Sequence, residues 1–430
     1  MPLSSATGNY LGKWNNQYAG NLTAWQSLTG KDAHSLSVWP HFVSSDDLHT
    51  LQPQLDKAGV PVPGITDDID GNPRDALTPD IGADEFVRFP NDAGIVQLVT
   101  PSGAFSTGQQ AIKVAVKNFG SAVLTSLDLR FSVDGQLQPA FHWTGNLAPD
   151  DTAQIIIGAF QFATLAHFSF VFYPEHPNGQ SDGDPANDTL KATLHPSLCG
   201  AYTIGGVSPD FPGMTEAVAA LEAFGVNCPV TFELRNGVYV LPSTILSAFE
   251  GAGSNHPVVF QSENGFANNV KILVGSPSLQ LESVQYLGFR NLSFESSGAY
   301  SHVFVLSNKC RNIRWENCDF TLAASGSGIT MGWGSSPTHD SLLITGCTFR
   351  DGHKAIFLYD VSHVFIENNV FDNLTSYGVE MSGSDCRLTG NRVVSNTPFT
   401  GGFYLSGAAI EVLKIDLDIR NGAGIFAWVY

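Results

Sequence analysis

Phe289-Arg-Asn-Leu-Ser-Phe294 is the first of five short segments that recur along the second half of the chain. The other four are Trp315-Glu-Asn-Cys-Asp-Phe320, Ile344-Thr-Gly-Cys-Thr-Phe349, Ile366-Glu-Asn-Asn-Val-Phe371 and Leu388-Thr-Gly-Asn-Arg-Val393. The first apolar residue advances by 26, 29, 22 and 22 residues from copy to copy, and the last apolar residue advances by the same steps. Short apolar segments with such a period, separated by Gly, Asn, Ser and Asp, are typical of a parallel β-solenoid in which each repeat forms one coil.

A second apolar motif keeps nearly the same period. Each copy has two apolar residues separated by one position, so both side chains face the same side of a strand. The copies are Val303/Val305, Ile329/Met331, Ile356/Leu358, Val379/Met381, Phe403/Leu405 and Ile425/Ala427. Because one coil cannot bury its own apolar face, we expect like residues of successive coils to stack in one continuous core.

The composition favours an all-β protein with many turns. The 430 residues are 43% hydrophobic and 14% charged, with 43 glycines and 29 phenylalanines. The formal net charge of -19 argues against a nucleic-acid partner and suits a soluble extracellular surface or cation binding. No apolar run has the length of a membrane span, so we expect none.

Two further regions precede the repeats. Residues 90–195 contain alternating runs such as Ala111-Ile-Lys-Val-Ala-Val-Lys117, and about seven short strands in about 100 residues are typical of an immunoglobulin-like sandwich. Residues 1 to about 86 are aromatic, polar and rich in turns. One amphipathic helix is expected over residues 215–224, where it would cover the open end of the apolar stack.

Two acidic segments suggest calcium as the one cofactor to consider. Asp68 and Asp70 lie in the first, and Asp182 and Asp184 begin the second, Asp182-Gly-Asp-Pro-Ala-Asn-Asp188. Carboxylates at alternate positions suit a hard cation. For the first segment we prefer a capping turn in which aspartate side chains accept backbone N–H groups and Arg74 pairs with a carboxylate. For the second segment we prefer a solvated turn.

Six cysteines are present, without metal-binding spacing. Cys199 and Cys228 flank one apparent structural unit and are candidates for a disulfide, which presumes an oxidising compartment. Cys318 and Cys347 occupy equivalent positions in successive coils, and Cys310 and Cys386 each open a coil. We expect these four to be small buried apolar residues.

The two ends of the chain suggest a stretch of a longer protein. Met1-Pro-Leu-Ser-Ser lacks the features of a signal peptide, and Gly424-Ile-Phe-Ala-Trp-Val-Tyr430 has the pattern of a strand with no cap after it.

Two segments of the chain have the pattern of caps. Cys199-Gly-Ala-Tyr-Thr-Ile-Gly-Gly206 with Cys228-Pro-Val-Thr-Phe232 looks like an opening cap, and Asp68-Ile-Asp-Gly-Asn-Pro-Arg74 with Asp80-Ile-Gly-Ala-Asp-Glu-Phe86 looks like a closing element. In these segments the chain resembles secreted right-handed parallel β-helix surface proteins of gliding-type bacteria, which are exported by the type IX route. Val116-Lys-Asn-Phe-Gly120 resembles CARDB sandwich modules. The resemblance implies the closing segment of one β-helix over residues 1–88, an immunoglobulin-like (CARDB-like) sandwich over 89–196, and a truncated right-handed parallel β-helix over 197–430.

Outward-facing positions of the coils supply the candidate site residues. The expected ladder is Phe304, Thr330, Phe357, Glu380, Tyr404 and Phe426. Exposed aromatic rings suit sugar binding, and the candidates are Tyr359, Tyr404, Phe357, Phe426 and Trp333, unless another segment covers this face. If the chain is an enzyme, a polysaccharide lyase or glycoside hydrolase, Lys354, Glu380 and Asp360 are the candidates for base and carboxylates.

Three functions follow from these observations. The first is a non-catalytic, rod-like structural or adhesive protein, extracellular or at the cell surface, that binds glycans. The second is a carbohydrate-active enzyme of the polysaccharide lyase type. The third is a subunit of an extracellular filament, since solenoid ends and strand edges allow copies of the chain to stack.

Overall fold

The computed structural model describes residues 10–40, 42–50, 52–275, 279–296, 298, 302–331, 339–395, 401–419 and 423–429. It is all-β, with 6% helix and a solenoid of about 8 turns. The chain divides into two compact units. One comprises residues 1–99, 113–158 and 170–192, and the other comprises residues 100–112, 159–169 and 193–430.

Regular elements are sparse before residue 93 among the described residues. A hairpin of β1 (Gly12–Trp14) and β2 (Gln17–Ala19) leads into α1 (Leu22–Thr29). The Asn21 side chain caps this helix by accepting the Ala24 N–H at 2.8 Å, and Gly30 ends it in the left-handed conformation. The expected polar, turn-rich region is held by hydrogen bonds of its side chains and of its turns.

A sandwich of two sheets follows, in which β5 pairs antiparallel with β6, β7 and β9. One sheet has the strand order β3-β4-β8, and the other has the order β10-β9-β5-β6 with β7 paired to β5. The strands are β3 (Ala93–Thr100), β4 (Gly108–Asn118), β5 (Leu124–Val133), β6 (Gln136–Leu137), β7 (Phe141–Leu147), β8 (Thr152–Phe162), β9 (Phe168–Glu175) and β10 (Leu190–Leu194), with a 3-10 turn at Pro177–Gly179. Leu127, Leu129, Phe131 and Val133 alternate inward along β5, as the sequence pattern requires.

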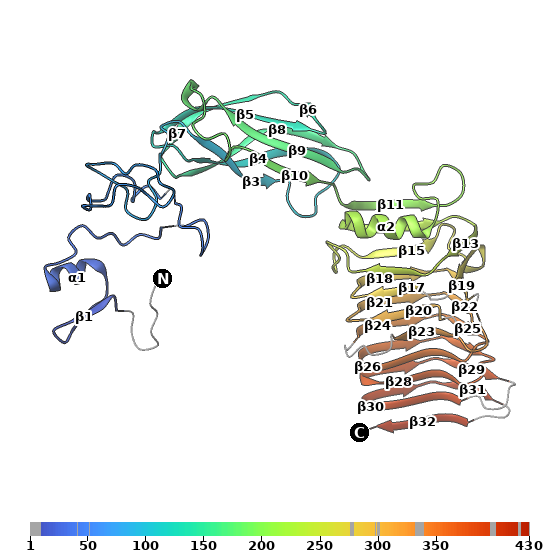
Figure 1. Cartoon of the computed structure of the whole chain (residues 1–430). Coiled ribbons are helices and arrows are strands. Elements are labelled where there is room, and N and C mark those ends of the chain that lie inside the picture. The colour runs from blue at the N-terminus through green and yellow to red at the C-terminus, as the bar shows by residue number, and fades with distance from the viewer. Residues whose placement is uncertain are drawn as a thin grey trace. The chain divides into compact units, whose positions relative to one another are not determined.

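The β-helix begins with a cap. Strand β11 (Leu198–Ile204) pairs in parallel with β12 (Val226–Leu234), and α2 (Met214–Phe224) lies between them in the sequence. Met214, Val218, Leu221 and Phe224 of α2 are buried in the same core as the first coils, so the helix covers the end of the stack as expected (Figure 1).

Each coil contributes strands to three faces. The first face runs through β12, β15 (Val258–Ser262), β18 (Gln285–Arg290), β21 (Arg311–Glu316) and β24 (Asp340–Thr345). The second runs through β13 (Gly237–Leu241), β16 (Val270–Val274), β19 (Ser293–Ser296), β22 (Asp319–Thr321), β25 (Thr348–Arg350), β27 (Val370–Asp372), β29 (Arg392–Ser395) and β31 (Asp416–Ile419). The third runs through β14 (Thr244–Ser247), β17 (Leu279–Glu282), β20 (Phe304–Ser307) and β23 (Ser327–Met331).

Three long strands join the third face to the first. They are β26 (Lys354–Glu367), β28 (Tyr377–Thr389) and β30 (Gly401–Leu413), and β32 (Ala423–Val429) pairs with β30. All pairings between coils are parallel, and Figure 1 shows the coils stacked from α2 to β32.

Like residues stack on like residues in the core. Phe294, Phe320, Phe349 and Phe371 are in register and fully buried. The rings of Phe320 and Phe349 are 4.4 Å apart and nearly parallel, at 8°. The repeat that decides the fold in the sequence is thus a column of aromatic rings along the solenoid axis.

One corner explains why asparagine and glycine share a position in the repeat. Asn291, Asn317, Gly346, Asn368 and Gly390 all adopt positive φ there, from 52° to 66°. A Cβ at Gly346 would lie 2.3 Å from Asn317 Oδ1, and a Cβ at Gly390 would lie 2.3 Å from Asn368 Oδ1. Asparagine tolerates this backbone conformation. Where the asparagine side chain of one coil occupies the space beside the same corner of the next coil, only glycine fits at that next corner.

The residue after this corner is buried in each coil and forms a short ladder. Asn369 donates from Nδ2 to the Ile344 carbonyl at 2.9 Å, and its Oδ1 accepts the Cys347 N–H at 2.9 Å. Asn391 Oδ1 accepts the Asn369 N–H at 3.0 Å. The amides therefore satisfy backbone groups at a corner where the sheet ladder is interrupted.

One predicted register is wrong. Phe304, rather than Val303, pairs with Ile329, and Leu306 pairs with Met331, so the pair Val303/Val305 is displaced by one residue. Phe304 was expected to face outward but is fully buried. The reason is that the corner residue before it, Val303, is buried as well, so burial does not alternate at this point of the chain.

Candidate functional site

The candidate site lies on the third face, where β26, β28 and β30 run side by side. Parallel pairing places Phe357 beside Glu380 and Glu380 beside Tyr404. Their sequence neighbours Ile356/Leu358, Val379/Met381 and Phe403/Leu405 are fully buried in the core. Because side chains alternate along a strand, the residue between each buried pair must face outward.

Glu380 is the centre of the site. Its Oε2 lies 2.7 Å from Lys354 Nζ, and its Oε1 accepts a hydrogen bond from Tyr359 Oη at 2.5 Å. Only 12% of the Glu380 side chain and 18% of the Lys354 side chain are exposed. An ion pair this shielded from water is less screened than one on an open surface, and both carboxylate oxygens are engaged.

Aromatic rings surround this charged centre. Lys354 Nζ lies 4.1 Å from the centroid of the Phe357 ring, which meets the Tyr359 ring edge to face at 5.0 Å. On the adjacent strands the Tyr377 and Tyr404 rings are 5.6 Å apart. All four rings are half-buried, so each presents part of its surface to solvent. We call Phe357, Tyr359, Tyr377 and Tyr404, together with Lys354 and Glu380, the aromatic patch.

Two titratable groups at the patch have shifted pKa values. Burial and the hydrogen-bonded Glu380 carboxylate raise the pKa of Tyr359 well above its ordinary value, so the phenol stays protonated. Burial and the neighbouring Lys354 ammonium lower the pKa of His353, which therefore remains neutral near pH 7.

The predicted base and one predicted carboxylate of the patch are paired with each other. A general base must direct a free lone pair at its substrate, whereas Lys354 faces Glu380 and both Glu380 oxygens have partners. Glycosidase chemistry needs two carboxyl groups across one bond. The second predicted carboxylate, Asp360, is exposed at a bulge with φ of 50°, and among the described residues it forms no ion pair or hydrogen bond with Lys354 or Glu380 through its side chain.

The other residues that the sequence predicted for this face are not part of the aromatic patch. Trp333 falls outside the described residues, and for Phe426 only the backbone is described, paired with Tyr404. Thr330 continues the ladder beside Phe357 but is buried. Tyr377 was not anticipated; its place at the start of β28, three residues before Glu380, was the available signal.

A hollow lies on the first face of the β-helix. Its volume is about 480 Å³. Gly288 is paired with Val259 on one side and with Arg314 on the other, and because it has no side chain it leaves a gap between these two outward-facing residues. Arg290 Nε is 2.6 Å from Glu316 Oε2, while Arg314 stays 59% exposed and 3.9 Å from the same carboxylate. The sequence offered only the missing side chain at Gly288 as a sign of this hollow.

The first pair of calcium candidates separates in the structure. Asp68 accepts the backbone N–H groups of Asp70, Asn72 and Glu85, which is the arrangement of a turn. Asp70 instead lies 2.5 Å from His49 Nε2, and with Asp84 these two form a group whose ligand atoms lie within 4.8 Å of one another. Hydrogen bonds to Asp70 and then to Asp47 raise the pKa of His49 to about 9, so its ring is a cation that neutralises these acids.

The second pair lies in a more buried setting. Asp182 accepts the N–H groups of Ala93 and Asp184 at 3.1 and 2.9 Å, in the loop before β10. Burial and the nearby carboxylates raise the pKa of Asp188 to about 7 and that of Asp92 to about 6. Four aspartates therefore share one largely buried region of the sandwich.

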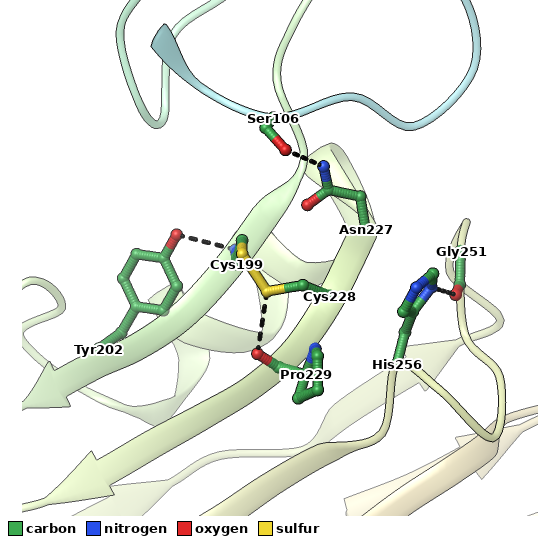
Figure 2. The surroundings of a disulfide bond; sticks show 8 residues. All are labelled: Ser106, Cys199, Tyr202, Asn227, Cys228, Pro229, Gly251 and His256. Atoms are coloured by element: carbon green, nitrogen blue, oxygen red, sulfur yellow. Dashed lines mark hydrogen bonds between the residues drawn. A yellow bond between two sulfur atoms is a disulfide. The ribbon is translucent and has the colours of Figure 1, made fainter.

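The cysteines divide into one disulfide and four thiols. Cys199 and Cys228 join β11 to β12 with their Cα atoms 5.0 Å apart, and Figure 2 shows the bond beside the contact of Asn227 Nδ2 with Ser106 Oγ at 2.7 Å. Cys310, Cys318, Cys347 and Cys386 are buried and free. Burial raises the pKa of the Cys318 thiol, so it behaves as an apolar residue.

None of the described helices has the length and apolar content needed to cross a bilayer.

Comparison with known proteins bears on the architecture. A right-handed β-helix region is matched at residues 277–428. No curated protein matches the chain.

Three solved structures illustrate the likeness. A domain assigned to a cell-surface protein of Methanosarcina acetivorans is 19% identical, with 25% of this chain and 94% of that one covered and a TM-score of 0.23. The CARDB domain of a Pyrococcus furiosus protein, in complex with di-metal ions, is 17% identical, with coverage of 26% and 93% and a TM-score of 0.21. Pectin methylesterase of Aspergillus niger is 9% identical, with coverage of 53% and 86% and a TM-score of 0.33.

The chain contains a parallel β-helix, part of which matches a right-handed β-helix region, and a β-sandwich.

Proposed function

We propose that the chain is a non-catalytic glycan-binding protein, in which the β-helix presents the aromatic patch as its binding surface. The observation that carries this proposal is that half-buried rings flank a carboxylate whose two oxygens are both occupied. Such rings offer flat apolar faces to the C–H faces of sugars.

The charge balance of the patch specifies the class of sugar. Lys354 and Glu380 neutralise each other, and among the described residues the patch has no further ionised group. An acidic sugar would have no unpaired cation to meet, and would have to compete with Glu380 for Lys354. We therefore infer that the ligand is a neutral glycan bound by ring stacking and by hydrogen bonds to its hydroxyl groups.

The surrounding architecture suggests an adhesive rod. We propose three parts, with a closing segment of a β-helix over residues 1–88, the sandwich over 89–196 and a β-helix over 197–430. The resemblance to secreted proteins of gliding-type bacteria supports export by the type IX route and an extracellular or cell-surface location, and the Cys199–Cys228 disulfide suits that oxidising environment. Surface glycans or further copies of the chain, in a filament, would be its partners, and nucleic acid would not.

An enzyme of the lyase or glycoside hydrolase type is the second candidate. The approach of Lys354 and Glu380 from adjacent coils favours it, since an acid and a base must meet in such a site. The occupied carboxylate and the exposed position of Asp360 weigh against it.

A glycan array with matched variants tests the proposal. Tyr404→Ala removes one ring of the patch, and Phe365→Ala removes an aromatic ring that is 38% exposed on a different face of the same coils. We expect Tyr404→Ala to weaken binding at least tenfold and Phe365→Ala to leave it unchanged. Equal binding by both variants and the unmodified chain would contradict the proposal.

A further inference from the structure

A buried carboxylate in the sandwich lacks the partners that such a group requires. Asp188 is only 8% exposed, and its Oδ1 has no hydrogen-bond partner. A buried carboxylate is normally paired with a cation or accepts several hydrogen bonds, because removing its charge from water is costly. This region therefore needs a further component to be satisfied.

The groups around Asp188 add further negative charge to the same region and do not compensate its carboxylate. Asp92, Asp182 and Asp184 are close enough for their charges to act on Asp188, and Asp92 is itself 5% exposed. Among the described residues no lysine, arginine or histidine forms an ion pair with any of these four carboxylates. The guanidinium of Arg88, whose charge acts on Asp92, is bonded instead to the carbonyls of Phe119 and Gly120 and to Asp150 Oδ1 at 3.1 Å.

Asn187 adds a neutral oxygen to the same place. Its Nδ2 bridges Asp92 Oδ1 at 3.1 Å and Asp184 Oδ2 at 3.3 Å, which leaves Oδ1 as its free end. That Oδ1 is buried without a partner. A Cβ on Gly94 would lie 2.7 Å from the Asn187 carbonyl oxygen and 2.9 Å from this Oδ1, so a side chain there would displace Asn187.

We propose that Asp92, Asp182, Asp184, Asp188 and the Asn187 amide oxygen form a binding site for one calcium ion. The ligand set is all oxygen, with carboxylates and an amide, which is the set that calcium prefers over softer metals. A divalent cation supplies the missing counter-charge to the buried carboxylate and a partner for both unsatisfied oxygens.

The spacing of the ligands predicts moderate affinity and a local movement. Among the described residues, no three of these carboxylates bring oxygens within 4.8 Å of one another. Binding must therefore draw the loop 182–188 inward around the ion, and part of the binding energy orders that loop. We expect a dissociation constant in the range of extracellular calcium modules, roughly 10⁻⁴ to 10⁻³ M.

The test compares calcium titrations of the full chain and its variants after treatment with chelator. Asp188→Asn keeps the shape of the side chain and removes its charge, Asp184→Asn does the same at a half-buried position, and Asp151→Asn is a matched control on the exposed surface of the same sandwich. By calorimetry we expect both cluster variants to lose one calcium site, or to bind it at least tenfold more weakly, while Asp151→Asn matches the unmodified chain.

A melting experiment keeps the inference falsifiable if calcium also binds elsewhere. In chelator, Asp188→Asn should raise the melting temperature, because it removes an uncompensated buried charge. In millimolar calcium, the unmodified chain should gain stability and the variant should not. The inference is overturned if the unmodified chain shows no response to calcium, or if calcium stabilises Asp188→Asn and Asp184→Asn as much as it stabilises Asp151→Asn.

Discussion

Replacing Phe320 by alanine should open a hole in the aromatic column that holds the coils together. The ring is fully buried and lies between Phe349, at 4.4 Å, and Phe294, at 5.4 Å, with both pairs stacked. Loss of a buried phenylalanine side chain costs about 3–5 kcal/mol. Each neighbouring ring belongs to a coil whose backbone is fixed by parallel pairing, so the cavity cannot collapse, and we expect about 4–5 kcal/mol.

The loss should be local, because each coil of a solenoid contacts mainly its neighbours. Hydrogen exchange read by mass spectrometry measures it directly, on peptides covering residues 311–350. At 1.36 kcal/mol per tenfold change, the amides of these coils should exchange roughly a thousandfold faster than in the unmodified chain. Phe266→Ala is the matched control, because that ring is 67% exposed. Its loss should change the free energy of unfolding by about 0.5 kcal/mol and the exchange rate by less than about threefold. Similar exchange in the two variants would refute the stacked-core account.

Three further predictions test separate features. Glu380→Gln should lower the pKa of Tyr359 toward its ordinary value, because the carboxylate that raises it is gone; an ultraviolet titration of the tyrosines measures this, and an unchanged titration would contradict the contact. In chelator, the sandwich should become less stable as the pH rises from about 4 to about 7. The reason is that burial raises the pKa of Asp188 in the folded chain to about 7 from 3.8, so the folded chain retains a proton that the unfolded chain releases. A series of melting temperatures over that pH range measures the effect. Stability that rises with pH would mean that the Asp188 carboxylate is paired with a cation, which would contradict the prediction. Replacing Cys199 and Cys228 by serine removes a crosslink over a sequence separation of 29, which should destabilise the cap by about 3–4 kcal/mol in chemical denaturation; equal stability with and without reductant would exclude that contribution.

The periodic part of the fold was accessible from the sequence because stacking repeats the same requirement in every coil. The spacing of Phe294, Phe320, Phe349 and Phe371 predicted the column of rings that the structure contains. The error at Val303 arose where a corner residue is buried next to a buried strand residue, so that two adjacent apolar positions gave two possible registers.

The candidate site was accessible only in part. Equivalent positions in adjacent coils placed Glu380 beside Phe357 and Tyr404. The register gives the face of the sheet but not the side-chain conformation. It could therefore not show that Lys354 and Tyr359 both turn toward Glu380. Around Asp188, the sequence indicated the acidic segment from Asp182 to Asp188 but not the approach of Asp92.

Asp92 and Asp188 lie far apart in the sequence, and only the pairing of the sandwich strands brings them into one buried cluster. The same holds for His49 and Asp70, which meet across a region with little regular structure. Neither contact leaves a periodic signal in the sequence.

The central claim is that the aromatic patch holds a glycan without transforming it. The most direct measurement incubates the unmodified chain with a glycan that it binds, and follows bound ligand and newly formed chain ends in the same sample over time. We predict saturable binding that Tyr404→Ala weakens, with intact glycan recovered and no chain ends beyond those seen with Glu380→Gln. Accumulation of cleaved or unsaturated products that stops in Glu380→Gln or Lys354→Ala would contradict the claim and identify the patch as an active site.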